Sequence, residues 1–437
     1  MQEDLLRQLE GAWEFSDRLF GRLEPSAMAQ QPIPLRQPFV FYVGHLPAFA
    51  WNQVARGVLD QPSFNPAFDR LFERGIDPLD VDQHAGQAAW PEMAEILAYR
   101  DAVRAAIREA LEVTDVQRSS DSLLANGRIF RVVLEHEQMH HETLLYMVQE
   151  LAAPHKRADD APAPAPAARA ERSVVTIPAG RARLGARWDE IPFGWDNEFE
   201  ACEVEVPAFR IDALPVRNAE FCEFVEAGGY GEPRWWSEDG WNWKERFRLA
   251  RPHGWIEQDG SGLRVRTAFA DVPFEDAASW PAMVSWAEAD AYAHWRGARL
   301  PSEAEFHRAA YGTPSGGERR QPWGDDDPAP SRGNFAFHSW RPAPAGAHPA
   351  GASAWGVHEL VGNGWEWTST RFAPLPGFRP YVRTYPGYSR DFFDGRHFVM
   401  RGASWATHAG LIRRSFRNWF QPHYPYVFSK FRCCYPS

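Results

Sequence analysis

The stretch "LEHEQMHHETLLYM" (residues 134–147) contains side chains that can bind a metal ion. His136, Glu137 and His140 form the H-E-x-x-H pattern of zinc proteases. Residues four apart lie on one face of an α-helix, so the two imidazoles can share one metal ion. The pattern therefore indicates either hydrolysis at zinc, with Glu137 as the general base, or different chemistry at another metal.

A third ligand decides between these two chemistries. A zinc protease of this type adds a glutamate or a histidine downstream of the pattern. Here the chain continues as "HETLLYMVQELAAPHKR" and runs into a Pro/Ala-rich stretch. The remaining candidate is His45 in "FYVGHLPAFAW", because bundle cores bind metals with side chains of facing helices. Three neutral imidazoles with open positions suit Fe(II), although the ligand types alone also allow zinc.

The elements that must position these histidines are helices in the first third of the chain. Apolar residues recur at helical spacing in four segments, 3–23, 37–59, 93–112 and 126–151. Four helices joined by loops predict an antiparallel bundle, which we assign to residues 1–152.

The remainder of the chain has a different character. Residues 153–172 are rich in Pro, Ala and charge and predict a semi-rigid linker. Residues 173–437 contain short apolar runs, many turn residues and two clear helical patterns, at 217–229 and 286–297. This mixture predicts an α+β domain with much irregular structure.

The composition excludes several classes of protein. The chain has 437 residues, 44% of them hydrophobic, and its net charge of −11 argues against a general nucleic-acid binder. No apolar run approaches the roughly 18 residues that a membrane span needs. The first residues lack the basic start and apolar core of a secretory signal. Four cysteines are too few for a disulfide framework. We expect a cytoplasmic protein with small-molecule partners.

Motifs along the whole chain resemble one enzyme family. "VGH" and "HEQMHHE" resemble the DinB-like four-helix bundle of the ergothioneine sulfoxide synthases. The second half resembles the formylglycine-generating-enzyme-like domain, a C-type-lectin-like fold that these synthases carry at the C-terminus. The matching pieces include "LPVRNAEFCEFVEAGGY", "GVHELVGNGWEWTST" and "RRSFRNWF". Together the motifs span almost the whole chain in the order that the family has.

The resemblance implies a reaction and its metal. In the family, iron and O₂ join a sulfur donor to C2 of the imidazole of hercynine, Nα-trimethylhistidine. The residues that match the iron ligands are His45, His136 and His140. A formylglycine-generating enzyme proper would need two cysteines near "SWATHAGLIRR", where this chain has none.

The resemblance also implies substrate-binding residues. An Asn-Trp pair near the C-terminus matches Asn418 and Trp419 in "FRNWF". A catalytic tyrosine comes from a nearby loop, here "PGFRPYVRTYPGYSRDFF". The loop offers Tyr381, Tyr385 and Tyr388, and position along the chain favours Tyr381.

Three departures from the family concern the second substrate. Phe420 stands where synthases that use γ-glutamylcysteine have Asp, and Met139 replaces a glutamine. The stretch "HAGQAAWPEM" has no arginine where the family binds donor carboxylates. These changes indicate a donor without amino-acid charges. They resemble the selenoneine synthase branch, which joins selenium from a selenosugar to hercynine. A pocket rebuilt for cysteine or γ-glutamylcysteine is the alternative.

Two further hypotheses stay open at this point. One is the zinc hydrolase with Glu137 as base. The other is a non-enzymatic, lectin-like binding module carried on a structural bundle.

Overall fold

The computed structural model describes residues 1–73, 90–117, 119–157, 171–258 and 262–436. The chain forms two compact units. The first comprises Met1–Asp159 together with Val382–Pro386, and the second comprises Asp160–Tyr381 and Gly387–Ser437. The short piece Val382–Pro386 therefore belongs to the helical unit, although the sequence places it deep in the second half.

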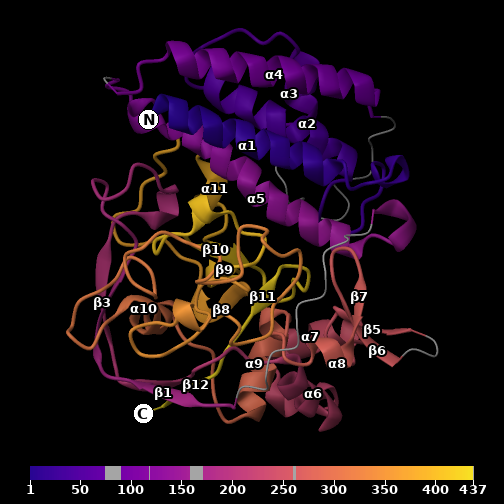
Figure 1. Ribbon diagram of the computed structural model, residues 1–437, viewed down its shortest axis with the longest axis vertical. Helices are drawn as coiled ribbons and strands as arrows, with labels where there is room; N and C mark the ends of the chain where they lie inside the picture. Colours follow the sequence, from indigo (N-terminus) through magenta and orange to yellow (C-terminus); the bar gives the residue numbers. More distant parts are fainter. Residues whose placement is uncertain (74–89, 118, 158–170, 259–261, 437) are drawn as a thin grey trace. The chain divides into compact units, whose positions relative to one another are not determined.

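The helical unit is built around four long helices, drawn side by side in Figure 1. α1 packs on α5 and α4, and α2 packs on α4 and α5. Each helix buries a face of apolar residues, which is the main source of its stability. The bounds are α1 Gln2–Phe20, α2 Phe39–Ala50, α4 Met93–Val113 and α5 Arg128–Glu150, with a short α3 at Pro66–Leu71.

α2 does not end as a regular helix. Pro47 lies inside it, and a single π-helical turn, η2 (Trp51–Arg56), continues it. Proline removes one backbone donor from the helical ladder, and π-turns re-aim the residues around them. All twelve residues of α2 are buried, so it is the central helix of the unit.

Both ends of the predicted linker at 153–172 have described residues. Residues Ala153–His155 form a 3₁₀ turn, and Lys156 pairs with Leu23 of the helical unit as an isolated β-bridge. Arg172, at the other end, forms an ion pair with Glu220 of the second unit. Residues 158–170 lie outside the described part of the chain.

The second unit is an α+β fold of small sheets, as the sequence predicts. One sheet has the order β10-β9-β8-β11, with β8 and β9 antiparallel and β11 parallel to β8. A second has the order β1-β4-β12, so the last strand lies beside early ones. A core of buried apolar residues joins this sheet to helix α10. The bounds in the two sheets are β1 Val174–Ile177, β4 Phe209–Asp212, β8 Gly364–Arg371, β9 Phe398–Ala403, β10 Asn418–Phe420, β11 Ser429–Lys430 and β12 Cys434–Pro436.

Two further sheets, one of two strands and one of three, and several helices complete the unit. The predicted helices appear as α6 (Asn218–Glu226) and α9 (Trp286–Trp295). The expectation of only two clear helices was wrong, because α7 (Glu238–Arg246) and α10 (Glu303–Tyr311) are also present. Both begin after a serine whose side chain caps the first turn. The remaining elements are β2 Gly180–Leu184, β3 Cys202–Val206, β5 Trp255–Gln258, β6 Gly262–Arg266, β7 Asp271–Pro273, α8 Phe274–Ala277 and α11 Gly387–Arg390.

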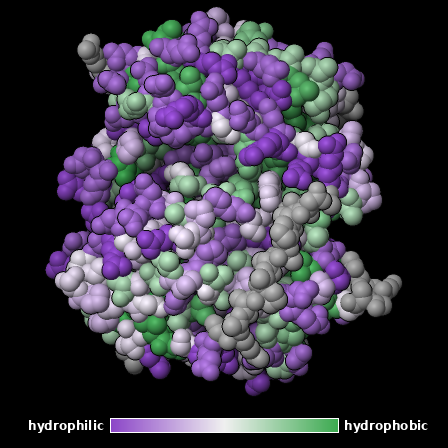
Figure 2. Space-filling model, viewed as in Figure 1, coloured by the Kyte–Doolittle hydropathy of each residue, from purple (hydrophilic) through white to green (hydrophobic). Residues whose placement is uncertain are grey.

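The surface is predominantly polar on the face drawn in Figure 2. Large hydrophobic side chains that are exposed are scattered along the chain rather than neighbours in sequence, for example Phe64, Val113 and Phe247. Among the described helices, none has the length and apolarity that crossing a membrane requires.

Candidate metal centre and substrate site

The structure brings the three predicted metal ligands together inside the helical unit. His45 comes from α2, and His136 and His140 come from α5. One ring nitrogen of each lies within 4.8 Å of the others, and all three side chains are buried. Among the described residues, this is the only group of three or more His, Cys, Asp or Glu with such geometry.

A backbone carbonyl fixes which nitrogen of His45 faces the cluster. Nδ1 of His45 donates a 2.6 Å hydrogen bond to the carbonyl of Phe72, just after α3. The proton is therefore on Nδ1, and the buried Nε2, which has no protein partner, keeps its lone pair. Histidines that bind metals are commonly oriented in this way.

The cluster favours neutral imidazoles. Burial lowers the pKa of His45 to about 4, against the opposing effect of the Phe72 carbonyl. Burial, and then the neighbouring histidines, lower the pKa of His136 and His140 well below 6.5. The Nε2 atoms of His136 and His140 are 3.2 Å apart. Three neutral nitrogen donors converging in a dry site fit a divalent transition metal such as Fe(II) or Zn(II).

Aromatic rings surround the histidines. Phe41 and Phe49 lie four residues before and after His45 on α2. Phe41 stacks on His45, with ring centroids 4.9 Å apart, and Phe49 stacks on His136 at 3.5 Å and 8°. Tyr385, from the Val382–Pro386 segment, meets Phe49 edge-on at 5.4 Å. The rings exclude water and limit the rotation of the imidazoles.

Glu137 faces a different helix from the metal cluster. Its carboxylate accepts a 2.6 Å hydrogen bond from Ser16 of α1, and Ser16 Oγ lies 2.7 Å from Nε2 of His141. Burial raises the pKa of Glu137 to about 7, opposed by Arg104 and Ser16. Glu137 therefore takes part in the packing of α1 on α5. Its carboxylate accepts the hydrogen bond from Ser16 and does not point to the three histidines.

The predicted substrate residues Asn418 and Trp419 lie on β10 of the second unit. A buried ion pair anchors the strand, because Arg417 Nε is 2.9 Å from Glu303 of α10. The indole of Trp419 stacks on Phe372 with centroids 4.1 Å apart and meets Tyr388 edge-on at 5.3 Å. Phe392 also contacts Trp419, with ring centroids 5.6 Å apart, so Trp419 belongs to an aromatic cluster.

The remaining predicted residues occupy three separate surroundings. The hydroxyl of Tyr381 donates to the carbonyl of Gly194 in the second unit. Phe420 stacks on Tyr424 at 5.0 Å, and successive strand residues point to opposite faces, so it faces away from Trp419. Met139 precedes His140 on α5 and is half-buried.

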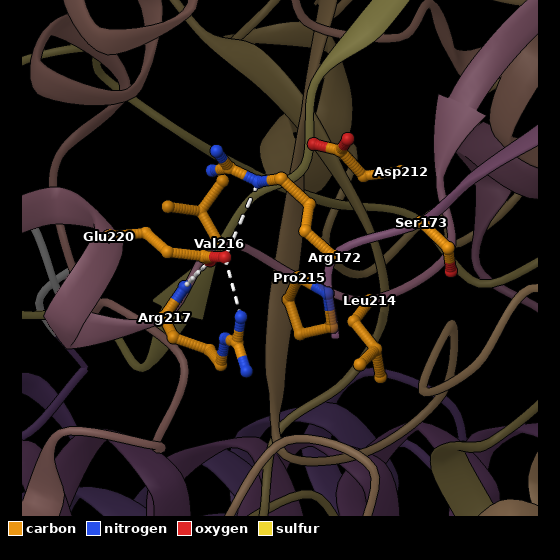
Figure 3. Close-up of a pocket in the computed structure, with 8 residues that line it drawn as sticks. All are labelled: Arg172, Ser173, Asp212, Leu214, Pro215, Val216, Arg217 and Glu220. Carbon is orange, nitrogen blue, oxygen red and sulfur yellow. Dashed lines mark hydrogen bonds and ion pairs between the residues drawn. The ribbon is translucent and has the colours of Figure 1, made fainter. Parts of the chain in front are cut away.

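A small pocket elsewhere in the second unit does not collect these residues. Figure 3 shows it between Arg172, Asp212 and Glu220. Glu220 forms ion pairs with Arg172 at 3.3 Å and with Arg217 at 2.7 Å. The lining charges neutralise one another, and none of the predicted site residues lines the pocket.

Sequence reasoning missed several residues around the metal centre. The repeated spacing of four between Phe41, His45 and Phe49 could have identified the two phenylalanines as flanking rings. The carbonyl of Phe72 has no sequence signal. The packing of Tyr385 on the helical unit has no sequence signal either, since the chain on both sides of Val382–Pro386 belongs to the other unit.

Comparisons with known proteins agree with this architecture. Residues 8–144 match the DinB superfamily, and residues 160–435 match the sulfatase-modifying factor enzyme 1-like domain. A hercynine oxygenase from Mycolicibacterium smegmatis is 36% identical, covering 99% of this chain and 98% of its own length. One from Mycobacterium tuberculosis is 39% identical over 91% of both chains. Ergothioneine biosynthesis protein 1 of Neurospora crassa is 30% identical over 96% of this chain, which spans 56% of that protein.

The fold and the matches define an enzyme in which a DinB bundle is joined to a sulfatase-modifying-factor-like domain. The binding-module hypothesis is thereby set aside in favour of an oxidative synthase. Within that class, the chain belongs to the hercynine oxygenase family.

Proposed function

We propose that this enzyme is a nonheme Fe(II)- and O₂-dependent synthase that joins a chalcogen donor to C2 of the imidazole of hercynine. The observation that carries the proposal is the buried cluster of His45, His136 and His140 in a relative of hercynine oxygenases.

The three imidazoles would hold Fe(II) through their converging nitrogens. A bound Fe(II) would supply open positions for O₂ and substrate and would pass electrons from the substrates to O₂, which is the oxidant. The chain contributes the orientation of the ligands, through the Phe72 carbonyl and the stacked rings of Phe41 and Phe49. It also keeps the imidazoles unprotonated near neutral pH.

The aromatic cluster around Trp419 of β10 can bind the trimethylammonium end of hercynine. Quaternary ammonium groups bind to the faces and edges of aromatic rings. Trp419, with Phe372 and Tyr388 around it, offers such surfaces, and Asn418 offers an amide for hydrogen bonding. Tyr381 is the expected catalytic tyrosine by position, and its hydrogen bond to Gly194 would hold its hydroxyl in place.

We assign the donor as a selenosugar, so that the product has a C–Se bond. Phe420 and the arginine-free stretch before α4 lack the charges that would bind an amino acid, and Met139 lacks the amide of the glutamine it replaces. Phe420 packs on Tyr424, which gives an apolar aromatic surface at that position. The second candidate is a thiol donor, cysteine or γ-glutamylcysteine, and the 36% and 39% identity to hercynine oxygenases favours it.

The zinc hydrolase hypothesis has less support. It requires Glu137 to act on a metal-bound water, whereas this carboxylate is bonded to Ser16. We also propose a cytoplasmic location, which the four unbridged cysteines support.

The test is reconstitution of the metal-free chain with Fe(II) under anaerobic conditions. Three parallel reactions each contain hercynine and one donor, which is a selenosugar, cysteine or γ-glutamylcysteine. O₂ is then admitted, and O₂ uptake and product mass are measured. We expect a hercynine–selenium adduct that requires both Fe(II) and O₂. Conversion of a thiol alone would replace the selenium assignment with the second candidate. Activation by zinc, with peptide cleavage and no O₂ uptake, would overturn the synthase itself.

A further inference from the structure

The segment Val382–Pro386 is held on the helical unit by contacts from three of its residues. Arg383 forms a two-pronged ion pair with Asp121, at 3.0 and 2.7 Å. The carbonyl of Thr384 accepts a 3.3 Å hydrogen bond from Gln53 of η2. Tyr385 packs edge-on against Phe49.

The fit between this segment and η2 is close. A Cβ atom at Gly57, directly after η2, would lie 2.6 Å from Cγ2 of Thr384. A side chain at this position would therefore push the Thr384 side chain or the helix end aside. The packing is therefore specified by the residue types on both sides, rather than by a single exposed ion pair.

The segment reaches a metal ligand through one ring. Phe49 is nearly parallel to His136 at a centroid distance of 3.5 Å, so the plane of Phe49 constrains the plane of the imidazole. Tyr385 covers an edge of Phe49. Moving Tyr385 would free Phe49 to tilt, and His136 would lose the surface that holds its ring.

We propose that Val382–Pro386 is a clasp that sets the orientation of His136, with Tyr385 as a positioning residue acting through Phe49. Arg383 and Asp121 lock the clasp in place. The inference rests on the proposed metal centre, and it holds for a sulfur donor as well as for a selenium donor. It gives Tyr385 a mechanical role that differs from the chemical role expected of Tyr381.

The test uses the full-length metal-free chain titrated with Co(II), whose visible absorption reports ligand geometry. We expect Arg383→Glu, which sets like charges against each other, to shift the cobalt bands and weaken Co(II) affinity roughly tenfold, as loss of support for a metal ligand commonly does. The exchange Arg383→Asp with Asp121→Arg should restore both. Tyr385→Ala should reproduce the shift, and Tyr385→Phe should keep the wild-type bands.

A matched control comes from another ion pair of the same unit. Arg108 and Glu10 are 2.9 Å apart with side chains 41% and 39% exposed, comparable to 46% and 34% for Arg383 and Asp121. Arg108→Glu should leave the cobalt bands unchanged. Wild-type bands in both Arg383→Glu and Tyr385→Ala would overturn the clasp while the metal centre stands. No Co(II) binding by the wild-type chain would overturn the metal centre, and the clasp with it.

Discussion

The hydroxyl of Ser16 on α1 donates a hydrogen bond of 2.6 Å to the carboxylate of Glu137 on α5. Successive residues of an α-helix point about 100° apart, so His136 can face α2 while Glu137 faces α1. The H-E-x-x-H pattern is therefore divided between two helix faces with different tasks. Its histidines belong to the three-histidine cluster with His45, and its glutamate belongs to a helix–helix contact.

Replacing Glu137 tests this division. Glu137→Gln keeps an oxygen that accepts from Ser16, so we expect unchanged metal content and synthase turnover within a few-fold of wild type. A general base would instead cost roughly 100- to 10,000-fold in rate. Ser16→Ala leaves buried polar groups without this partner and should lower stability by about 1–3 kcal/mol, measured by thermal unfolding. Loss of turnover in a folded, metal-loaded Glu137→Gln variant would contradict the assignment.

The three histidines should be separately required for metal retention. We expect His45→Ala, His136→Ala and His140→Ala each to purify without stoichiometric metal, measured by elemental analysis after Fe(II) loading and gel filtration. His141 is the matched control, because it is equally buried on α5 but bonds to Ser16. His141→Gln should retain metal. Equal loss in the control would indicate that the assay reports unfolding.

Gly44 tests the orientation of His45. A Cβ atom at this position would lie 2.5 Å from the ring of Phe72, whose carbonyl holds His45. We expect Gly44→Ala to displace Phe72 and weaken metal affinity by roughly tenfold. Gly11 on α1 has open space around it, so Gly11→Ala should leave the affinity unchanged and stabilise the helix by up to about 1 kcal/mol. Isothermal titration with Co(II) and thermal unfolding measure both effects.

The aromatic cluster around Trp419 should determine the affinity for hercynine. We expect Trp419→Ala to raise the KM for hercynine roughly five- to thirtyfold, which corresponds to the roughly 1–2 kcal/mol that a desolvated cation–π contact contributes. Trp286 is the comparison, since it also stacks on a ring of the same unit, Phe398 at 3.8 Å. Trp286→Ala should lose stability without a selective change in KM. Steady-state kinetics at saturating donor distinguish the two.

Asp196 should give a recognisable pH dependence of stability. Burial raises the pKa of its carboxyl to about 6, although Ser389 donates to it. Between about pH 4 and 6, Asp196 is protonated in the folded chain but ionised in the unfolded chain. The free energy of unfolding therefore falls as the pH rises through this range. Asp196→Asn should remove this slope and add up to about 3 kcal/mol at pH 7. The exposed Asp189, whose pKa is lowered by Arg187, should give no such gain when replaced by Asn. Urea unfolding at pH 4 and 7 measures the difference.

The long helices and the metal histidines could be predicted because their signals are local and periodic. Apolar residues at helical spacing identified α1, α2, α4 and α5, and spacing of four placed His136 beside His140. His45 was proposed because it lies on another predicted helix of the bundle, and the resemblance then matched it to an iron ligand. No local pattern connects it with residues about ninety positions away. The short helices α7 and α10 were missed, although each follows a serine cap that is visible in the sequence.

The tyrosine loop shows the limit of position along the chain as a guide. Tyr381 and Tyr385 are four residues apart, yet one bonds to Gly194 and the other packs on Phe49 in a different unit. Which unit a loop residue joins depends on tertiary contacts such as Arg383 with Asp121. No pattern within the loop encodes that partner.

The packing of Val382–Pro386 on the helical unit limits which domain exchanges this enzyme can tolerate. A chimera cut at the Pro/Ala-rich stretch would separate the bundle from five residues that complete its surface. We therefore expect a chimera to keep the bundle surface only if both domains come from the same enzyme, or if the new second domain has residues equivalent to Arg383, Thr384 and Tyr385. Exchange of the second domain, natural or engineered, should succeed only where the new domain supplies residues that can contact Asp121, Gln53 and Gly57.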